Sequence, residues 1–261
     1  MSKKYYIAPL LFALFVSVSC ANTEKEQTLK SVIDSINIPS GKLILDNSQQ
    51  FLEELEIVLS ADTDYLLTLV DKQHYLSENY VPEDLVPLVK NNHYAINRTD
   101  LSLRKPVEKA LRIMADAALA ENITILVSST FRSYEYQKNL YARNVKQLGQ
   151  AVADRESAKP GTSQHQLGTA IDFGSITDDF AYTKQGKWLL ANAMKYGFSL
   201  SFPEGYEDVT GYRYECWHYR YIGVEACKMQ QKWFGNIQQY MLEFIYAWEK
   251  ANVVKTATLE N

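Results

Sequence analysis

Two short segments of this chain hold side chains whose types and spacing could do chemistry together. His165 and Asp172 lie in one run, and Glu215 and His218 lie in the motif E-x-W-H. A catalytic zinc ion takes three protein ligands and keeps a fourth position for water, whose pKa it lowers toward neutrality. His165, Asp172 and His218 supply such a ligand set. Glu215 is a carboxylate that could accept the proton of the water. The sequence therefore predicts a hydrolytic site with one zinc ion.

Each of these residues also has a structural explanation when it is taken alone. A single histidine is more often a hydrogen-bonded structural residue than a metal ligand. His74 and His93 lie in polar loop sequence without a partnered carboxylate motif, and we expect this structural role for both. The metal site is favoured because two histidines, an aspartate and a glutamate occur together in two motifs.

Short strands are expected to position the two motifs. Residues 169–173 alternate in the manner of a strand, and Gly168 permits a tight reversal of the backbone between the first two ligands. A strand at 123–129 is expected to deliver Arg132 to a loop. Further strands are expected at residues 65–70 and 213–221.

Longer segments show apolar residues at helical spacing. Two such segments within residues 28–60 predict an N-terminal helical extension, while the prolines of residues 80–88 favour an extended loop. Strands and helices alternate in no regular βαβ order, which predicts an α+β domain. Further helices are expected at 103–120, 133–149 (with an apolar stripe), 187–196 and 224–251 (with an aromatic stripe that packs on the domain).

The overall composition limits the possible partners. The chain has 27 Lys+Arg against 31 Asp+Glu, a net charge of −4, and no basic block. This excludes an electrostatic nucleic-acid surface, so no nucleic acid is expected as a partner. The aromatic content of 12% fits either a surface that handles sugars or extended peptides, or an aromatic-rich core.

Residues 1–20 are typical of an export signal. Two lysines precede an apolar run at residues 5–18, which is too short for a comfortable membrane span. The run ends in small residues followed by Cys20, as in bacterial lipoprotein signals, although Ser17 stands where such signals usually have Leu. We expect lipidation at Cys20, with a plain secretory peptide cut near it as the alternative. The protein is then exported and faces the periplasm or cell wall.

Cys216 and Cys227 are the other cysteines of the chain. In an exported protein their spacing permits one disulfide, and a pair of free buried thiols is the alternative. Nothing near Cys216 suggests a nucleophile.

The two motifs resemble a known family. The patterns S-x-H-x-x-G-x-A-x-D at 163–172 and E-x-W-H at 215–218 resemble the signature of the VanY-type D-alanyl-D-alanine carboxypeptidases, which are zinc metallopeptidases. The family includes L,D-carboxypeptidases that trim peptidoglycan stems. The resemblance spans residues 64–225 and takes in the run S-S-T-F-R-S-Y at 128–134. It implies a hedgehog-like, D-Ala-D-Ala-peptidase fold with a small, mostly antiparallel sheet flanked by helices.

The resemblance also implies roles for single residues. His165, Asp172 and His218 would bind the zinc ion, and Glu215 would be the catalytic base. Arg132 would hold substrate and stabilise the oxyanion, which suits its fixed charge and forked donors, with a structural salt bridge as its alternative.

Further positions match the wall of the family's substrate pocket or depart from its pattern. Gln137 and Ser163 match positions that line the pocket. Gln164 stands where many relatives have Glu, and Ser129-Thr130 replaces a common Gly. Because neither departure removes a ligand or the base, we expect them to affect substrate preference rather than activity.

The sequence thus predicts a zinc carboxypeptidase that removes the terminal D-alanine from peptidoglycan stem peptides. One alternative is an L,D-carboxypeptidase acting on tetrapeptide stems. Another is a non-catalytic zinc module that binds cell-wall peptides, although such a module would have no need of Glu215. The expected organisation is a signal segment (1–20), a tether and helical extension (21–63), a zinc carboxypeptidase domain (64–225) and a C-terminal helix packed on it (226–261).

Overall fold

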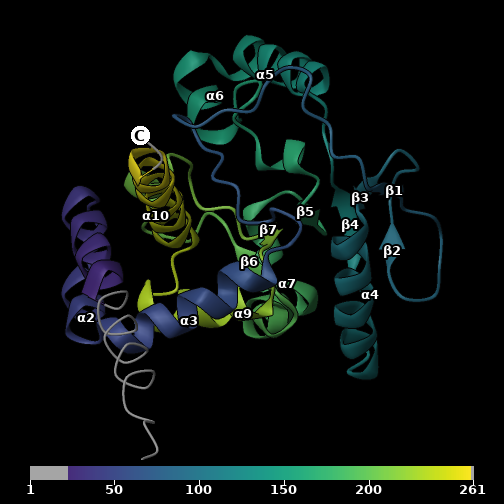
Figure 1. Ribbon diagram of the computed structural model, residues 1–261. Coiled ribbons are helices and arrows are strands. Elements are labelled where there is room, and N and C mark those ends of the chain that lie inside the picture. The colour runs from purple at the N-terminus through teal and green to yellow at the C-terminus, as the bar shows by residue number, and fades with distance from the viewer. Residues whose placement is uncertain (1–22, 260–261) are drawn as a thin grey trace, which may run out of the picture.

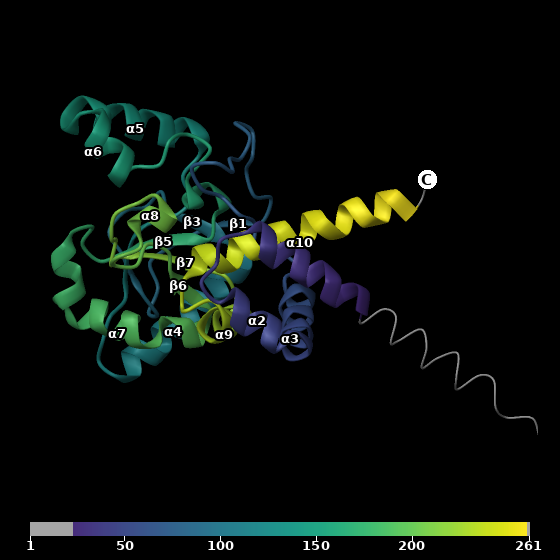
Figure 2. The same cartoon turned by 90° about the vertical axis from the view of Figure 1, so that its left-hand side faces the viewer.

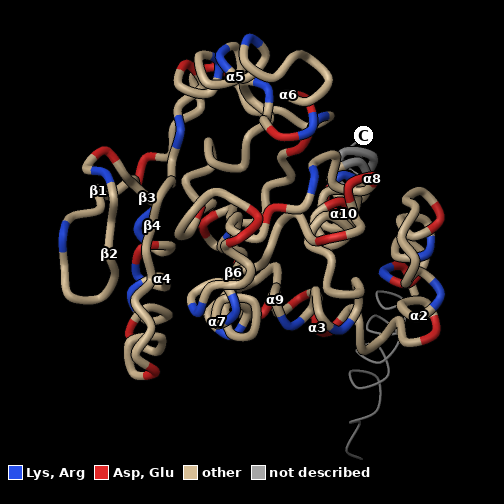
Figure 3. Tube along the Cα trace, turned by 180° about the vertical axis from the view of Figure 1, so that it is seen from behind, with Lys and Arg blue, Asp and Glu red and all other residues tan. Residues whose placement is uncertain are grey.

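The computed structural model describes residues 23–259. The expected signal segment, with Cys20, therefore lies outside the described residues. Within residues 23–259, no helix combines the length and the apolar character needed to cross a membrane. Basic and acidic residues are interspersed along the trace (Figure 3), as the balanced composition predicts.

A five-stranded sheet occupies the middle of the molecule, in the order β2-β4-β5-β7-β6. Only β2 and β4 pair in parallel; the other three pairs are antiparallel. This confirms the prediction of an α+β protein with a mostly antiparallel sheet. The strands are β2 (Ala95–Ile96), β4 (Leu126–Ser129), β5 (Ala170–Phe173), β6 (Phe198–Leu200) and β7 (His218–Tyr221), with a separate antiparallel pair of β1 (Leu85–Pro87) and β3 (Ser102–Arg104).

The first hydrophobic core joins this sheet to α4 (Lys105–Ala120) and α7 (Lys184–Asn192). Helix α4 starts with Pro106 in its first turn, where a missing N–H costs no helical hydrogen bond, and it buries Leu111 and Met114. Figure 2 shows α4 and α7 on one side of the sheet and a pair of helices on the other. That pair is α5 (Tyr134–Leu148) and α6 (Gln150–Glu156).

The second core is helical and unites the two ends of the described chain (Figure 1). Phe51 lies at its centre with no exposed surface, in edge contacts with Trp233, Phe234 and Phe244. The expected N-terminal and C-terminal extensions therefore form one packed unit. Its helices are residues 23–35, α2 (Gly41–Asp46), α3 (Ser48–Ala61), α9 (Val224–Trp233) and α10 (Gln238–Leu259).

The expected strand at residues 65–70 is wrong, since this apolar run is an irregular loop. Its backbone groups bond to side chains instead of to a neighbouring strand. The carboxylate of Asp62 accepts from the N–H of Leu66 at 2.6 Å and of Leu67 at 3.1 Å. The buried guanidinium of Arg220 donates to the carbonyls of Leu66 and Thr68 at 2.6 and 2.8 Å.

The single long helix expected at 224–251 is also wrong. The chain breaks between α9 and α10, where Gly235 and Asn236 have φ values of 59° and 65°. The side chain of Gln230 stabilises the break by donating to the carbonyl of Asn236 at 2.9 Å. Glycine and asparagine tolerate this left-handed conformation better than other residues, so the pair ends a helix that the apolar stripe alone would continue. The aromatic stripe packs in the second core, mainly against the N-terminal helices, whereas the prediction placed it on the catalytic domain.

The stripe expected on the helix at 133–149 does not reach a core. Helix α5 begins where predicted, with Ser133 accepting from the N–H of Tyr136, but Tyr136 and Leu148 are exposed. Instead, α5 packs mainly on α6 and the two stand out from the body (Figures 1 and 2). The remaining short helices are η1 (Gln164–Leu167), η2 (Asp178–Tyr182), η3 (Ala193–Tyr196) and α8 (Glu207–Thr210).

Cys216 and Cys227 are both buried and free, so of the two alternatives the pair of thiols is the one found.

Candidate metal centre and its cavity

The sheet brings the two motifs together. Asp172 on β5 and His218 on β7 are direct partners in the antiparallel register. His165 lies on η1, and the side chain of Ser163, the residue that caps η1, accepts from the N–H of His165 at 3.3 Å. Gly168 ends η1 with φ 68°, which turns the chain into β5. Among the described residues, His165, Asp172 and His218 form the group of metal-binding type, with ligand atoms all within 4.8 Å of one another.

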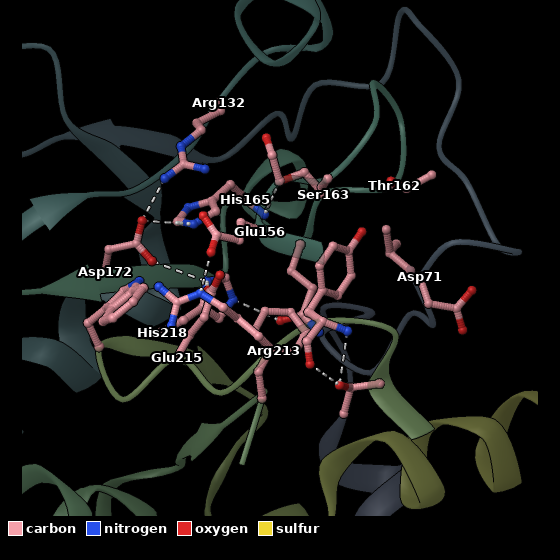
Figure 4. Close-up of a pocket in the computed structure, with 18 of the residues that line it drawn as sticks. Asp71, Arg132, Glu156, Thr162, Ser163, His165, Asp172, Arg213, Glu215 and His218 are labelled. Carbon is pink, nitrogen blue, oxygen red and sulfur yellow. Dashed lines mark hydrogen bonds and ion pairs between the residues drawn. The ribbon is translucent and has the colours of Figure 1, made fainter. Parts of the chain in front are cut away.

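The geometry of the three side chains fits a bound cation. Nε2 of His165 lies 3.2 Å from Oδ2 of Asp172, and Nδ1 of His218 lies 3.1 Å from Oδ1 (Figure 4). Nε2 of His165 and Oδ1 of Asp172 are buried without a hydrogen-bond partner among the described residues. Two imidazoles and a carboxylate are ligands that zinc accepts.

In both histidines, the ring nitrogen that faces away from Asp172 lies next to a hydrogen-bond acceptor, and this contact determines the tautomer of the imidazole. Nδ1 of His165 lies 2.7 Å from the carbonyl of Thr130, and Nε2 of His218 lies 3.2 Å from Oε1 of Gln164. Because a carbonyl oxygen can only accept, these nitrogens carry the protons, and the lone pairs of Nε2 in His165 and Nδ1 in His218 are free to bind a metal.

The electrostatics keep these groups in their metal-binding protonation states. Burial, reinforced by Arg132, lowers the pKa of His165 to about 4, so its imidazole is neutral near pH 7. Burial opposes the ionisation of Asp172, yet His165 and Arg132 hold the pKa of its carboxyl well below its usual range. Neutral imidazole and ionised carboxylate are the forms that bind a metal.

Glu215 lies beside the three side chains, with Oε2 3.7 Å from Nδ1 of His218. Burial and then the charge of Asp172 raise the pKa of Glu215 to about 8, against the opposing effects of Arg132 and Arg213. A carboxyl whose pKa is near the working pH can both accept and return a proton.

Arg132 follows β4 and reaches the same place (Figure 4). Its Nη2 lies 2.5 Å from Oδ2 of Asp172, and its Nε donates to Oγ of Ser129 at 3.0 Å. The salt bridge expected as an alternative role is therefore present. Arg132 also lines the cavity, so the salt bridge and a contact with substrate are compatible.

A cavity of about 270 Å³ opens on this group of residues. Ser163 lines it, as the resemblance implied. Gln137 does not, which corrects the expected position of this residue: it is buried behind the wall, where its Nε2 donates to the carbonyl of Ala158 at 2.7 Å. Ala158 in turn lines the cavity, so Gln137 supports the wall rather than forming it.

Several residues have positions in the site that the sequence did not predict. Gln164 accepts from His218 and from Ser201, the latter at 2.7 Å, and so orients the imidazole of His218 from behind. Gln164 lies next to His165 in the motif, and this position is the feature of the sequence that could have indicated its role. Tyr212 and Arg213 line the cavity as well, and Arg213 is held by Asp178 at 2.7 Å. No motif marked these two.

The other two histidines have the structural roles predicted for them. Nδ1 of His74 lies 2.9 Å from Oδ1 of Asp71, and Nδ1 of His93 lies 2.6 Å from Oδ1 of Asp116. Neither belongs to the metal-binding group.

Comparisons with known proteins agree with this site. Residues 100–224 match the family model described as VanY: D-alanyl-D-alanine carboxypeptidase. The chain is 33% identical to the putative carboxypeptidase YodJ of Bacillus subtilis, over 83% of either chain. It is 26% identical to a D-alanyl-D-alanine carboxypeptidase of Enterococcus faecium, over 92% of this chain and 79% of that relative.

Solved structures show the same fold. The LdcB LD-carboxypeptidase matches with a TM-score of 0.62 at 35% identity, over 68% of this chain and 86% of that one. A variant of the D,D-pentapeptidase VanY, solved in complex with Zn(II), matches with a TM-score of 0.57 at 27% identity, over 69% of this chain and 99% of that one. The Zn(II) in that structure and the His-Asp-His group here indicate one zinc ion.

Proposed function

Because this chain belongs to the VanY family of D-alanyl-D-alanine carboxypeptidases, we propose that it removes the terminal D-alanine from peptidoglycan stem peptides. It is a zinc-dependent peptide hydrolase. The proposed substrate rests on the family match itself, together with relatives described as D-alanyl-D-alanine carboxypeptidases. A solved relative, VanYB in complex with D-alanine-D-alanine, supports the same substrate class.

We propose His165, Asp172 and His218 as the zinc ligands. Zinc bound there would lower the pKa of a water molecule and polarise the scissile carbonyl. Glu215 would take the proton of the attacking water and return it to the leaving amine, a role that its place 3.7 Å from Nδ1 of His218 supports. Burial of the ligands excludes bulk water, which strengthens these electrostatic effects.

The proposed roles of the other residues follow from their contacts. Arg132 offers fixed positive charge beside Asp172 for the developing oxyanion or for the substrate. Ser163 lines the cavity and is proposed to bind substrate. For Gln137, we propose an indirect part in substrate binding, through the wall segment that it holds at Ala158.

L,D-carboxypeptidase activity on tetrapeptide stems is a second candidate. It is favoured by the similarity to the LdcB LD-carboxypeptidase, which has the highest TM-score among the structures compared above. The two activities differ in the configuration of the residue before the scissile bond.

The proposed place of action is the cell envelope. Relatives that act on cell-wall peptides support action outside the cytoplasm. We further propose attachment to the membrane by lipid on Cys20, which the sequence of residues 1–20 supports. Residues 64–225 would form the catalytic domain, with the helical unit of both chain ends beside it.

The test is incubation of the purified, zinc-loaded protein with muropeptides that carry pentapeptide or tetrapeptide stems. Mass spectrometry of the released alanine should show loss of one D-alanine from the pentapeptide. Release from the tetrapeptide alone would establish the L,D alternative. Binding of both stems without any released alanine would instead establish a non-catalytic module and overturn the proposal.

A further inference from the structure

A second cavity of about 630 Å³ adjoins the cavity of the metal centre. Three residues, Asp71, Thr210 and Gln239, line both cavities. All three are buried, and Gln239 donates to Oδ2 of Asp71 at 2.9 Å. The two cavities therefore adjoin along one layer of shared side chains.

Most residues that line the second cavity lie outside the segment that matches the family model, although residues 208–211 belong to that segment. One wall comes from residues 35–37, at the end of the first described helix, and another from Glu243, Tyr246 and Ala247 on α10. The family match ends at residue 224. The helical extensions thus form part of a cavity that adjoins the one at the metal centre.

The size of the first cavity leaves part of a stem peptide outside it. Its volume of about 270 Å³ lies below the range of roughly 300–1,000 Å³ typical of sites for drug-sized ligands. A pentapeptide is at least that large, so the residues before the scissile bond must continue beyond the first cavity. The second cavity, which adjoins the first along the shared side chains, offers room for these residues.

The charges set the direction of such a peptide. Figure 4 shows Asp71 at the end of the cavity remote from Asp172 and Arg132. A terminal carboxylate is attracted to Arg132 and repelled by Asp71, so the amino-terminal part of the stem points toward Asp71 and the second cavity. The second cavity carries both carboxylates, such as Glu243, and the ammonium groups of Lys72 and Lys250, which suits a polar peptide.

We infer that the second cavity is a binding subsite for the part of the stem peptide that precedes the scissile bond. The inference rests on the proposed substrate class. It assigns to the helical extensions a role in selecting long stems over short peptides with the same scissile bond. The residues that would contact the peptide include Asp71, Gln239 and Glu243.

The first test compares two substrates of the wild-type protein. The KM for a pentapeptide stem should be at least tenfold lower than that for an acylated dipeptide with the same scissile bond. Equal KM values for the two would overturn the subsite.

The second test fills the cavity. Ala247 lines only the second cavity, so Ala247→Trp should raise the KM for the pentapeptide about tenfold and leave the acylated dipeptide within twofold of wild type. Val253→Trp is the matched control, since Val253 is exposed on the same helix and lines neither cavity. Equal losses with both substrates, in a variant with wild-type thermal stability, would contradict the inference.

A binding measurement keeps the subsite separate from catalysis. Calorimetry with the zinc-loaded protein and a stem tripeptide that lacks the terminal alanines should give a Kd at least fivefold weaker for Ala247→Trp than for Val253→Trp. If no substrate is hydrolysed but this difference is found, the proposed function fails and the subsite stands. If the tripeptide binds both variants equally, the subsite fails whatever the activity.

Discussion

Glu215 is the residue on which the proposed mechanism depends most directly. Glu215→Gln keeps the size of the side chain but removes its ability to accept a proton. We expect kcat to fall about 10²–10⁴-fold, the usual contribution of a general base. Bound zinc should stay at one per chain because Glu215 is not among the three proposed ligands. Alanine release and elemental analysis measure the two quantities, and a variant with more than a tenth of wild-type kcat would refute the role.

The same carboxyl predicts how the stability of the metal-free protein depends on pH. Burial first, and then Asp172, raise the pKa of Glu215 from 4.5 to about 8 in the folded state. Between these values the folded protein binds more protons than the unfolded chain, so the free energy of unfolding falls as pH rises through this range. His165 has a pKa of about 4 in the folded state and about 6.5 in the unfolded chain, so above pH 6.5 it opposes this trend by less than about 0.5 kcal/mol.

Urea denaturation from pH 6.5 to 8 should therefore show a loss of about 2 kcal/mol in the metal-free protein. The variant Glu215→Gln should show little of this loss. An equal slope in both proteins would assign the pH dependence to other groups.

At the scale of elements, Gly168 joins η1 to β5 and so sets the distance between two proposed ligands. It has φ 68°, and an added Cβ would lie 2.9 Å from Cδ2 of Leu85 and 3.0 Å from Cγ of Arg104. Gly168→Ala should lower the free energy of unfolding by about 2–3 kcal/mol, since backbone strain adds to these contacts. The affinity for zinc should fall as well, because the contacts displace the segment that carries His165.

Gly205→Ala is a suitable control for this substitution. Gly205 has a similar φ of 82°, but an added Cβ would meet no atom within 4 Å. This variant should lose about 1 kcal/mol from strain alone and bind zinc with unchanged affinity. Chemical denaturation and zinc titration of both variants separate strain from contact, and equal zinc affinity in the two would argue against a positioning role for Gly168.

The elements around the metal centre were predictable because their signals are local. Strand β5 is a short, mostly apolar run that begins two residues after Gly168, and α4 has an apolar face with proline in its first turn. The segment 65–70 has the same apolar character as a strand, yet its hydrogen bonds come from Asp62 and Arg220. Arg220 lies far away in the sequence, so no local pattern could show that it replaces a strand partner.

The same distinction holds within the site. The proposed ligands and base were predicted from motifs, whereas Gln137 was assigned to the pocket wall and lies behind it. Its partner, the carbonyl of Ala158, belongs to a segment with no motif of its own. Tyr212 reaches the cavity through the packing of the loop before β7, which the sequence does not specify.

At the scale of the whole molecule, zinc should stabilise the fold. A ligand that binds only the folded state adds about 4 kcal/mol at a thousandfold excess over its Kd. Removal of the metal with a chelator should therefore lower the Tm and abolish hydrolysis, and added zinc should restore both. Differential scanning calorimetry with and without chelator measures the effect; an unchanged Tm with full activity would exclude zinc as the cofactor.

The shared core of the two chain ends has a consequence for the order of folding. Residues 23–61 are made first, but the helices they pack against, α9 and α10, are the last described segments to leave the ribosome. The apolar face around Phe51 must therefore wait for nearly the whole chain, and such distant contacts form slowly. Until α9 and α10 have been made, this apolar face has no partner within the second core. A truncated mRNA that ends before α10 would yield a chain whose first helices lack their packing partner. Quality-control proteases would recognise that chain by its exposed apolar surface.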